Sequence, residues 1–472
     1  MEMFGNYDVV VVGAGITGTV AAIRAAREGA RTLLVEGSGV LGGLVTGGRL
    51  TKPTGVVNGG VFQELIDRCA RYGGADNQVR STHWGSYTGS FDAEVMQRVI
   101  IEAIEEAQVE VLLRAQVVQA VMEGNRVRGL ELRTKSGAKL VLARVFIDAS
   151  GDGDVAALAG AEHMLGRESD GLTQPITSYF RVLNVDIPKL VEYSKAHRDD
   201  LTDLVLPEHE ATRNEDYVML LLVRGFTKRI EEAKRQGFRW IIPKNNITLK
   251  AGLIPGELNV NVTRFQGSGL DDRTLSRAEI EIRKQAYCAF DFLKQYVAGF
   301  ENAIFLEVAP KLGVRETRRI RGRYVLSESD VLSQARFADA IGLCNSPVDI
   351  HEPGGTGASM RTVGSGYGIP FRCIVPQAIE GLYVAGRCIS VDAVAFGSTR
   401  NVPACAMTGE AAAVAAAHCA KHDIETSQVP VAIVQERLRE HGIELGISDE
   451  GADRGKQGGA DAVTGQVAVT HS

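Results

Sequence analysis

Three glycines and one acidic residue near the N-terminus have the spacing of a dinucleotide-binding turn. Gly13, Gly15 and Gly18 form the pattern Gly-x-Gly-x-x-Gly, and Glu36 follows 21 residues after Gly15. In such a turn the first glycine permits the bend, the second lets a pyrophosphate approach the backbone, and the third lets helix and strand pack closely. A carboxylate placed like Glu36 accepts hydrogen bonds from ribose hydroxyls. The pattern predicts dinucleotide binding; the alternative is a glycine-rich helix start with an unrelated surface glutamate.

The elements around this motif follow the order that such a turn requires. Residues 8–12 are predicted to form a buried parallel strand, residues 16–28 a helix and residues 31–36 a second strand. This is a βαβ unit of about 30 residues. A small antiparallel meander is expected beside the parallel sheet, with strands at 109–113, 117–122, 126–134, 139–142 and 145–148.

The predicted fold class is α/β, with a Rossmann-like dinucleotide-binding domain and an α+β substrate domain. Residues 1–164 and 366–445 are assigned to the first domain, because an alanine-rich helix at 402–420 can return to the sheet. Residues 165–365 mix strands and helices and are assigned to a substrate or cap domain. Residues 446–472 are rich in Gly, Asp and Ala without periodicity, which predicts a mobile tail.

Residues 8–43 resemble the opening of the FAD-dependent oxidoreductases of the glutathione-reductase-like flavoprotein superfamily. In these flavoproteins a second glycine pair lies near the FAD phosphates, and Gly42 and Gly43 match that pair. Further segments resemble, in the same order, the family called FAD-dependent oxidoreductase, namely residues 146–154, 312–319, 369–373 and 382–390. The resemblance implies one FAD in a single Rossmann domain. Non-covalent binding is the default expectation, because the sequence carries no clear signature of attachment by His, Cys or Tyr, and covalent attachment stays open.

The resemblance also implies where FAD is contacted. Val117 and Val118 match the place where main-chain groups meet the adenine. Arg387 follows Gly386 where many relatives carry an acid, so a cation is expected there, beside a flavin phosphate. The helix that begins after Asn401 would direct its positive end at the flavin. The expected cofactor-binding residues are Gly13, Gly15, Ile16, Thr17, Gly18, Glu36, Gly37, Gly42, Gly43, Val117, Val118, Ala149, Ser150, Gly151, Asp154, Gly386, Arg387, Asn401 and Val402.

The substrate side is predicted from polar residues near glycine-rich loops. His351 is a candidate general acid or base, and its alternative is a surface histidine. Tyr367 is a candidate donor from a flexible loop. Arg400 is the third catalytic candidate, because arginine binds carboxylates in a bidentate manner. The substrate-binding candidates are His83, Asn261, Arg264, Arg315 and Arg372.

Three functions fit these features. The favoured one is a dehydrogenase or reductase that moves a hydride between a small polar molecule and flavin N5. The alternatives are a flavin monooxygenase or oxidase, and a flavin electron-transfer subunit of a larger complex. A second dinucleotide fingerprint and a Cys-x-x-Cys pair are absent from the sequence, which argues against a pyridine-nucleotide–disulfide reductase. The electron donor or acceptor therefore stays open.

Charge and composition limit the partners. The net charge of −6 and the pI of about 5.9 argue against nucleic-acid binding. No apolar stretch approaches the length of a membrane span, and the N-terminus lacks the pattern of a secretory signal. The seven dispersed cysteines suit a reducing compartment, so a cytoplasmic location is expected. No metal ligands are predicted, and a homo-oligomer stays open.

Overall fold

The chain is described from a computed structural model that places residues 1–57, 59–76, 79–82 and 85–447, without the side chains of residues 79–88. Most of the predicted tail, residues 448–472, lies outside the described residues.

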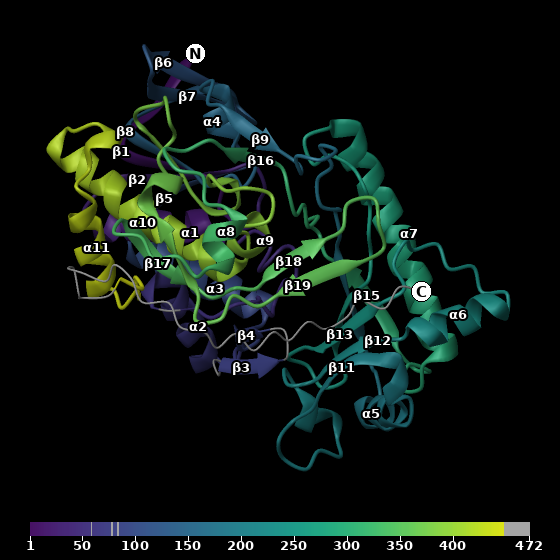
Figure 1. Cartoon of the computed structure of the whole chain (residues 1–472). Helices are drawn as coiled ribbons and strands as arrows, with labels where there is room; N and C mark the ends of the chain where they lie inside the picture. The colour runs from purple at the N-terminus through teal and green to yellow at the C-terminus, as the bar shows by residue number, and fades with distance from the viewer. Residues whose placement is uncertain (58, 77–78, 83–84, 448–472) are drawn as a thin grey trace.

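A seven-stranded sheet carries the N-terminal motif (Figure 1). Its parallel strands lie in the order β5, β2, β1, β8 and β21, and β7 and β6 continue from β8 as an antiparallel meander. The predicted α/β class, with a parallel sheet and a meander, is confirmed. The bounds are β1 Glu2–Val12, β2 Thr32–Glu36, β5 Glu110–Leu113, β6 Gln116–Glu123, β7 Arg126–Thr134, β8 Gly137–Asp148 and β21 Leu382–Val384.

Strand β8 is longer than the sequence suggested. The predicted strands 139–142 and 145–148 are one strand, because β1 pairs with it from Lys139 to Asp148, with one register shift between Met3 and Gly5. On its other edge, β8 pairs first with β7 and then with β21. The strand therefore joins the meander to the parallel sheet and ends, with β1 and β21, at the edge where the glycine motif lies.

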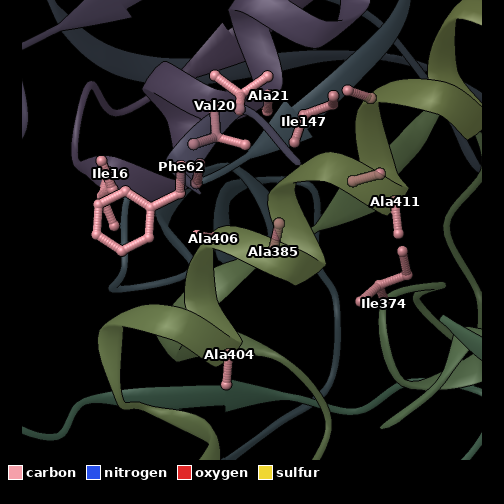
Figure 2. Packing of buried hydrophobic residues seen from close by; sticks show 14 of the residues in the cluster. Ile16, Val20, Ala21, Phe62, Ile147, Ile374, Ala385, Ala404, Ala406 and Ala411 are labelled. Carbon is pink, nitrogen blue, oxygen red and sulfur yellow. The ribbon is translucent and has the colours of Figure 1, made fainter. Parts of the chain in front are cut away.

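Two helices pack against each other over this sheet. Helix α1 (Ile16–Arg27) follows the glycine motif, and α10 (Val402–His422) returns from the far end of the chain. Figure 2 shows Val20 and Ala21 of α1 in the same cluster as Ala411 of α10. Small side chains permit this close contact. Helices α2 (Gly60–Arg71) and α3 (Ala93–Glu106) complete the layer. Asp92 caps α3, because its side chain accepts hydrogen bonds from the first turn of that helix.

A six-stranded antiparallel sheet forms a second core beside the first. Its strands lie in the order β11, β12, β13, β14, β10 and β15. One face packs under helices α5 (Ile187–Ala196), α6 (Thr227–Arg235) and α7 (Asp272–Tyr296), which lie on the right of Figure 1. The bounds are β10 Tyr179–Leu183, β11 Leu201–Val205, β12 Leu222–Gly225, β13 Ile247–Ala251, β14 Leu258–Asn261 and β15 Ile304–Val308.

Short elements connect the two sheets. They include β9 His163–Leu165 with β16 Arg318–Ile320, β17 Ala340–Cys344 with β20 Tyr367–Pro370, and β18 Val348–His351 with β19 Ala358–Arg361. Leu326 and Ile341, which the sequence assigned to the cap domain, pack in the core formed by α1 and α10. The proposed domain division at residue 365 therefore stays a prediction. No helix in the described part of the chain is long and apolar enough to cross a membrane.

We predict that Gly409→Ala destabilises the protein although it lies inside a helix. Alanine would gain about 1 kcal/mol of helix propensity. A Cβ at Gly409 would, however, lie 2.4 Å from the Thr17 carbonyl oxygen, and overpacking of this kind costs about 1–3 kcal/mol. Thermal unfolding should give a lower melting temperature, whereas Lys421→Ala at the exposed end of α10 should change it little. A melting temperature for Gly409→Ala at or above that of the wild type would contradict the packing argument.

Candidate functional site

The first turn after β1 needs two of its glycines for reasons internal to the protein. Gly13 has a φ of 94°, and a Cβ on it would lie 2.5 Å from the Ala149 carbonyl oxygen. A Cβ on Gly18 would lie 1.8 Å from the Gly13 carbonyl oxygen. The packing of α1 on the sheet therefore requires both residues, as the motif predicts.

Gly15 is different, because nothing in the protein requires a glycine there. Its φ of −62° and ψ of 177° suit any residue, and a Cβ on it would meet no atom within 4 Å. No side chain caps the start of α1, so the first N–H groups of the helix face the same open space. Unoccupied volume beside free helix N–H groups fits a pyrophosphate that approaches the backbone. The described residues thus fit the phosphates of FAD.

Glu36 lies beside this turn as a buried, ionised carboxylate. It accepts hydrogen bonds from the N–H groups of Ala14 and Ser38, each at 2.8 Å. Burial favours the neutral acid, but Lys311 and these N–H groups outweigh it and lower the pKa of Glu36. The carboxylate retains acceptor capacity for ribose hydroxyls. The sequence did not point to Lys311, because this residue is far from Glu36 along the chain. The backbone N–H of Lys311 donates to the Gly47 carbonyl, which ties its segment to the glycine-rich loop.

The second glycine pair lies directly on the first turn. The N–H of Gly42 donates to the Ala14 carbonyl at 2.7 Å. A Cβ on Gly43 would lie 2.7 Å from the Cα of Gly15, and both Gly42 and Gly43 have positive φ values. The two glycine segments thus form one wall of the site that the resemblance implies.

The loop after β8 provides another wall. Asp148 is fully buried, and burial raises its pKa to about 6. It accepts hydrogen bonds from Ser150 and from the N–H of Ala156, which fixes Ala149, Ser150 and Gly151 beside the first turn. The predicted contact Asp154 forms an ion pair with Arg318 at 2.9 Å.

Several other predicted FAD contacts lie in or near these walls. Ile16 and Thr17 are buried, and a Cβ on Gly386 would lie 2.5 Å from the Thr17 hydroxyl oxygen. Arg387 forms an ion pair with Asp152 at 2.5 Å, so its predicted pairing with a flavin phosphate stays a prediction.

At the adenine end, Gly37 lies close to Gln116, the first residue of β6. Val117 and Val118 follow it on that strand, and the side chain of Val118 is exposed. Main-chain contact with the adenine therefore stays a prediction for both residues.

One open cavity of about 1360 Å³ lies between the start of α10 and the antiparallel sheet. Asn401 and Val402 line it where α10 begins, and no side chain caps that helix end. Five other lining residues form a row across adjacent strands of the sheet, on the face opposite its apolar core. In register order this row is Asp203, Arg224, Thr248, Asn261 and Tyr179.

The cavity is cationic although the whole chain is acidic. Its described lining includes seven lysine or arginine residues and two aspartates, in a chain with a net charge of −6. An excess of positive charge in a cleft attracts anions. The cations are Lys52, Arg224, Lys244, Lys250, Arg315, Arg387 and Arg400, and the acids are Asp203 and Asp349.

A chain of polar contacts leads from α10 to the predicted acid–base residue. The Arg400 guanidinium donates to the Asp349 carboxylate at 2.9 Å, and that carboxylate lies 3.5 Å from the His351 Nε2. Burial favours the neutral form of Asp349, but His351, Arg400 and Arg315 outweigh it and hold its pKa well below its usual range. Burial and the nearby Arg315 lower the pKa of His351 to about 3. At neutral pH the pair is therefore a carboxylate and a neutral imidazole.

The structure separates the predicted substrate residues into two groups. His351, Arg400, Asn261 and Arg315 line the cavity. Asn261 donates to the Tyr179 hydroxyl at 3.2 Å, so the sequence also missed Tyr179.

Three predicted residues lie elsewhere, contrary to expectation. Tyr367 is buried in β20, where it donates to the Ser398 hydroxyl at 2.7 Å, so it is a core residue and not a loop donor. Arg264 donates to loop carbonyls that include that of Thr356, and Arg372 pairs with Asp339 outside the cavity. Their guanidinium groups are thus occupied within the protein. His83 lies outside the described residues.

No group of three or more His, Cys, Asp or Glu side chains with the geometry to hold a metal ion occurs in the described ranges.

A βαβ turn with an ionised acid, a second glycine pair and a converging helix end defines a dinucleotide-binding flavoprotein. The chain belongs to the FAD dependent oxidoreductase family, whose family model matches residues 8–438. The predicted family, the FAD cofactor and the assignment as an oxidoreductase enzyme are thereby confirmed.

Two curated proteins are similar to part of the chain. Digeranylgeranylglycerophospholipid reductase 1 of Methanococcoides burtonii is 28% identical over 160 residues, which cover 32% of this chain and 38% of that protein. Protein FixC of Salmonella typhimurium is 26% identical over 209 residues, which cover 39% of this chain and 44% of that protein. The similarity therefore spans less than half the length of either relative.

Solved structures are similar over most of the chain at low identity. GidA of Aquifex aeolicus has a TM-score of 0.49 and 14% identity, and the match covers 88% of this chain and 64% of that one. p-Nitrophenol 4-monooxygenase PnpA of Pseudomonas putida DLL-E4 has a TM-score of 0.48 and 12% identity, with 94% and 85% covered. Neither value carries an argument about substrate or reaction.

We predict that Gly15→Ala, and more strongly Gly15→Val, removes FAD without unfolding the apoprotein. The added carbons have room in the protein but occupy the space that fits the pyrophosphate. The flavin-to-protein absorbance ratio and a fluorescence titration with FAD should reveal at least a tenfold weaker affinity, with the melting temperature of the apoprotein unchanged.

The matched control is Gly357→Ala, an exposed glycine whose added Cβ would meet only the end of the Glu352 side chain. Full flavin content in Gly15→Val would contradict the assignment of this space to the cofactor.

Proposed function

We propose that this chain moves a hydride between FAD and a small polar molecule bound in the cationic cavity, and that His351 moves the accompanying proton. The observation that carries the proposal is that three features line one cavity. They are the uncapped start of α10, the Arg400–Asp349–His351 contacts and the polar face of the antiparallel sheet. FAD supplies hydride exchange at its N5 atom when it is bound.

The acid–base residue is supported by its electrostatic surroundings. The lowered pKa of His351 keeps its imidazole unprotonated at physiological pH. The imidazole becomes basic enough to accept a proton from a substrate hydroxyl or amino group when the positive charge around it is offset in the substrate complex. Asp349 stays ionised and can stabilise the imidazolium that forms. Arg400 fixes Asp349 from the first turn before α10, so it acts as a positioning residue.

The start of α10 supports the placement of the flavin. A helix end without a capping side chain carries a partial positive charge, which stabilises negative charge on a group placed against it. Asn401 uses its amide to donate to carbonyls that include that of Pro347, so this side chain leaves the helix N–H groups open. This arrangement favours reduction of a flavin at that position.

We expect His351→Asn to slow flavin reduction by about 10²–10⁴-fold with FAD content unchanged. The removed group moves a proton but does not hold the cofactor. The substrate is first found by anaerobic screening of hydroxy acids, polyols and amines for flavin bleaching near about 450 nm, and the rate is then measured by stopped flow. His209→Asn, an exposed histidine, is the control. Equal rates for His351→Asn and wild type would exclude the assigned role.

The pH dependence provides a separate prediction for the wild type. A histidine with an ordinary pKa of about 6.5 loses its proton-accepting form as the pH falls to 5. His351, with its pKa lowered to about 3, keeps that form. The rate of flavin reduction per unit substrate concentration, measured well below saturation, reports the free enzyme and should therefore stay constant between pH 7 and pH 5. A tenfold fall over this range would show that a different group accepts the proton.

A further inference from the structure

Four cations of the cavity have no carboxylate partner among the residues that the structure describes. Arg224 donates from its Nε to the Asn246 side chain, and Arg315 donates to the Pro175 carbonyl. Both partners are neutral, so they hold each guanidinium in place without balancing its charge. The ammonium groups of Lys244 and Lys250 likewise form no ion pair within the described ranges. The two aspartates of the lining, Asp203 beside Arg224 and Asp349 near Arg315, are too few to balance the cations, so the cavity keeps an excess of positive charge.

The antiparallel sheet aims part of this charge at the cavity. Arg224 is on β12 and Lys250 on β13, and both extend from the polar face of the sheet. Lys250 lies over the Tyr179 ring, with its Nζ 5.7 Å from the ring centre. The apolar face of the same strands is covered by helices, so the register of the sheet fixes the direction of both side chains. The opposite wall, formed by β18 and the start of α10, provides the acid–base residues, and the two sides could hold different ends of one molecule.

Lys244 is the most deeply buried of these cations. It is 8% exposed, and its carbonyl accepts a hydrogen bond from the Trp240 indole at 3.1 Å, which fixes the loop before β13. The charged groups that face it are Arg224, Arg315 and Arg264, together with Asp349.

The surroundings of Lys244 disfavour its charged form while the cavity holds no anion. Burial, and then repulsion by the three arginines, lowers the pKa of Lys244 to about 7, and the attraction of Asp349 is too weak to offset them. An unpaired lysine held in this way is poised between its two protonation states near neutral pH.

We propose that the substrate carries a carboxylate or phosphate group that Lys244 binds together with Arg224 and Lys250, and that Lys244 takes up a proton when this group binds. The proposal rests on the proposed function only in assuming that the substrate occupies this cavity. It goes beyond it by naming the anionic class of the substrate and the residues that select it. The proposed anion site adds Arg224 and Lys250 of the antiparallel sheet to the arginines that the sequence indicated.

The linkage has a defined sign. A bound anion favours the charged ammonium, so it raises the pKa of Lys244. Below the pKa of the free site, Lys244 is already protonated and affinity does not depend on its titration. Above that pKa each binding event takes up a proton, and affinity falls about tenfold per pH unit until the pKa of the bound state is reached. An Arg at this position stays charged throughout.

The test is calorimetric titration of the FAD-loaded protein at pH 8 in two buffers of different ionisation enthalpy. Succinate and inorganic phosphate are the two anionic probes, and the singly charged acetate is the comparison. We expect one of the two probes to bind with uptake of nearly one proton and with tighter affinity at pH 6.5 than at pH 8. Binding of succinate identifies a carboxylate subsite, and binding of phosphate identifies a phosphate subsite.

Three variants separate the role of Lys244 from general charge. Lys244→Arg should keep binding but lose proton uptake and the pH dependence. Lys244→Met should weaken binding at least tenfold at pH 6.5, with flavin content and circular dichroism unchanged. Lys189→Met, which removes a surface lysine paired with Glu301, should behave as wild type.

The failures of the two proposals are distinguishable. Absence of binding by both probes at millimolar concentration, or wild-type proton uptake in Lys244→Arg, would overturn the anion subsite. Probe binding that depends on Lys244, in a protein whose flavin no screened molecule bleaches, would support the subsite and count against the proposed hydride transfer.

Discussion

The contact between α1 and α10 at the edge of the parallel sheet is the constraint on which the site depends. It joins segments nearly 400 residues apart in sequence. An added Cβ at Gly409 of α10, or at Gly386 after β21, would lie too close to Thr17 of α1. Arg24 of α1 and Glu410 of α10 add an ion pair at 2.6 Å. The two helices start near the same edge of the sheet. The uncapped N-terminus of α1 faces the phosphate-sized space beside Gly15, and the uncapped N-terminus of α10 faces the cavity. With FAD in the proposed position, both positive helix ends would stabilise negative charges of the one cofactor.

The distribution of charge follows a second constraint, which is that buried charges are costly unless they are balanced. Within the parallel-sheet unit the protein balances its own charges, as in the pairs of Arg387 with Asp152 and of Arg319 with Glu316. On the wall formed by the antiparallel sheet, Arg224 and Lys250 form no ion pair among the described residues, although Asp203 lies beside Arg224 in the sheet. Residues whose charges are paired stabilise the fold, whereas the cations without an ion pair are available to bind an anionic ligand.

The sequence predicted most of the fold, and the motif residues that it assigned to FAD binding lie together at one edge of the parallel sheet. Its signals there are local: Gly13, Gly15 and Gly18 lie within six residues, and Glu36 follows at the end of the next strand. The substrate half depends on strand register between distant segments. Arg224 and Asn261 face the cavity only because β12, β13 and β14 pair in one particular register.

The incorrect predictions have the same cause. Tyr367 is surrounded by glycines in sequence, which indicated a flexible loop, but pairing with β17 buries it. Arg264 resembled a ligand-binding arginine because its carbonyl partners, in the loop after β18, are almost 100 residues away. Lys244 gave no signal at all, since a single lysine in a loop is ordinarily solvated. Only tertiary structure shows that this one is buried.

The two unusual titrating groups of the cavity are linked through Arg315. This guanidinium lowers the pKa of His351 and the pKa of Lys244. An anion placed among the cations would offset that effect at both residues, so its arrival would make His351 a stronger proton acceptor and Lys244 a stable cation. A neutral analogue of the same shape would leave both residues as they are. Selection of an anionic substrate and activation of His351 for proton transfer are therefore two consequences of one cluster of excess positive charge. A neutral molecule in the same cavity would leave His351 a weak base, so it would be a poor partner for the proton transfer.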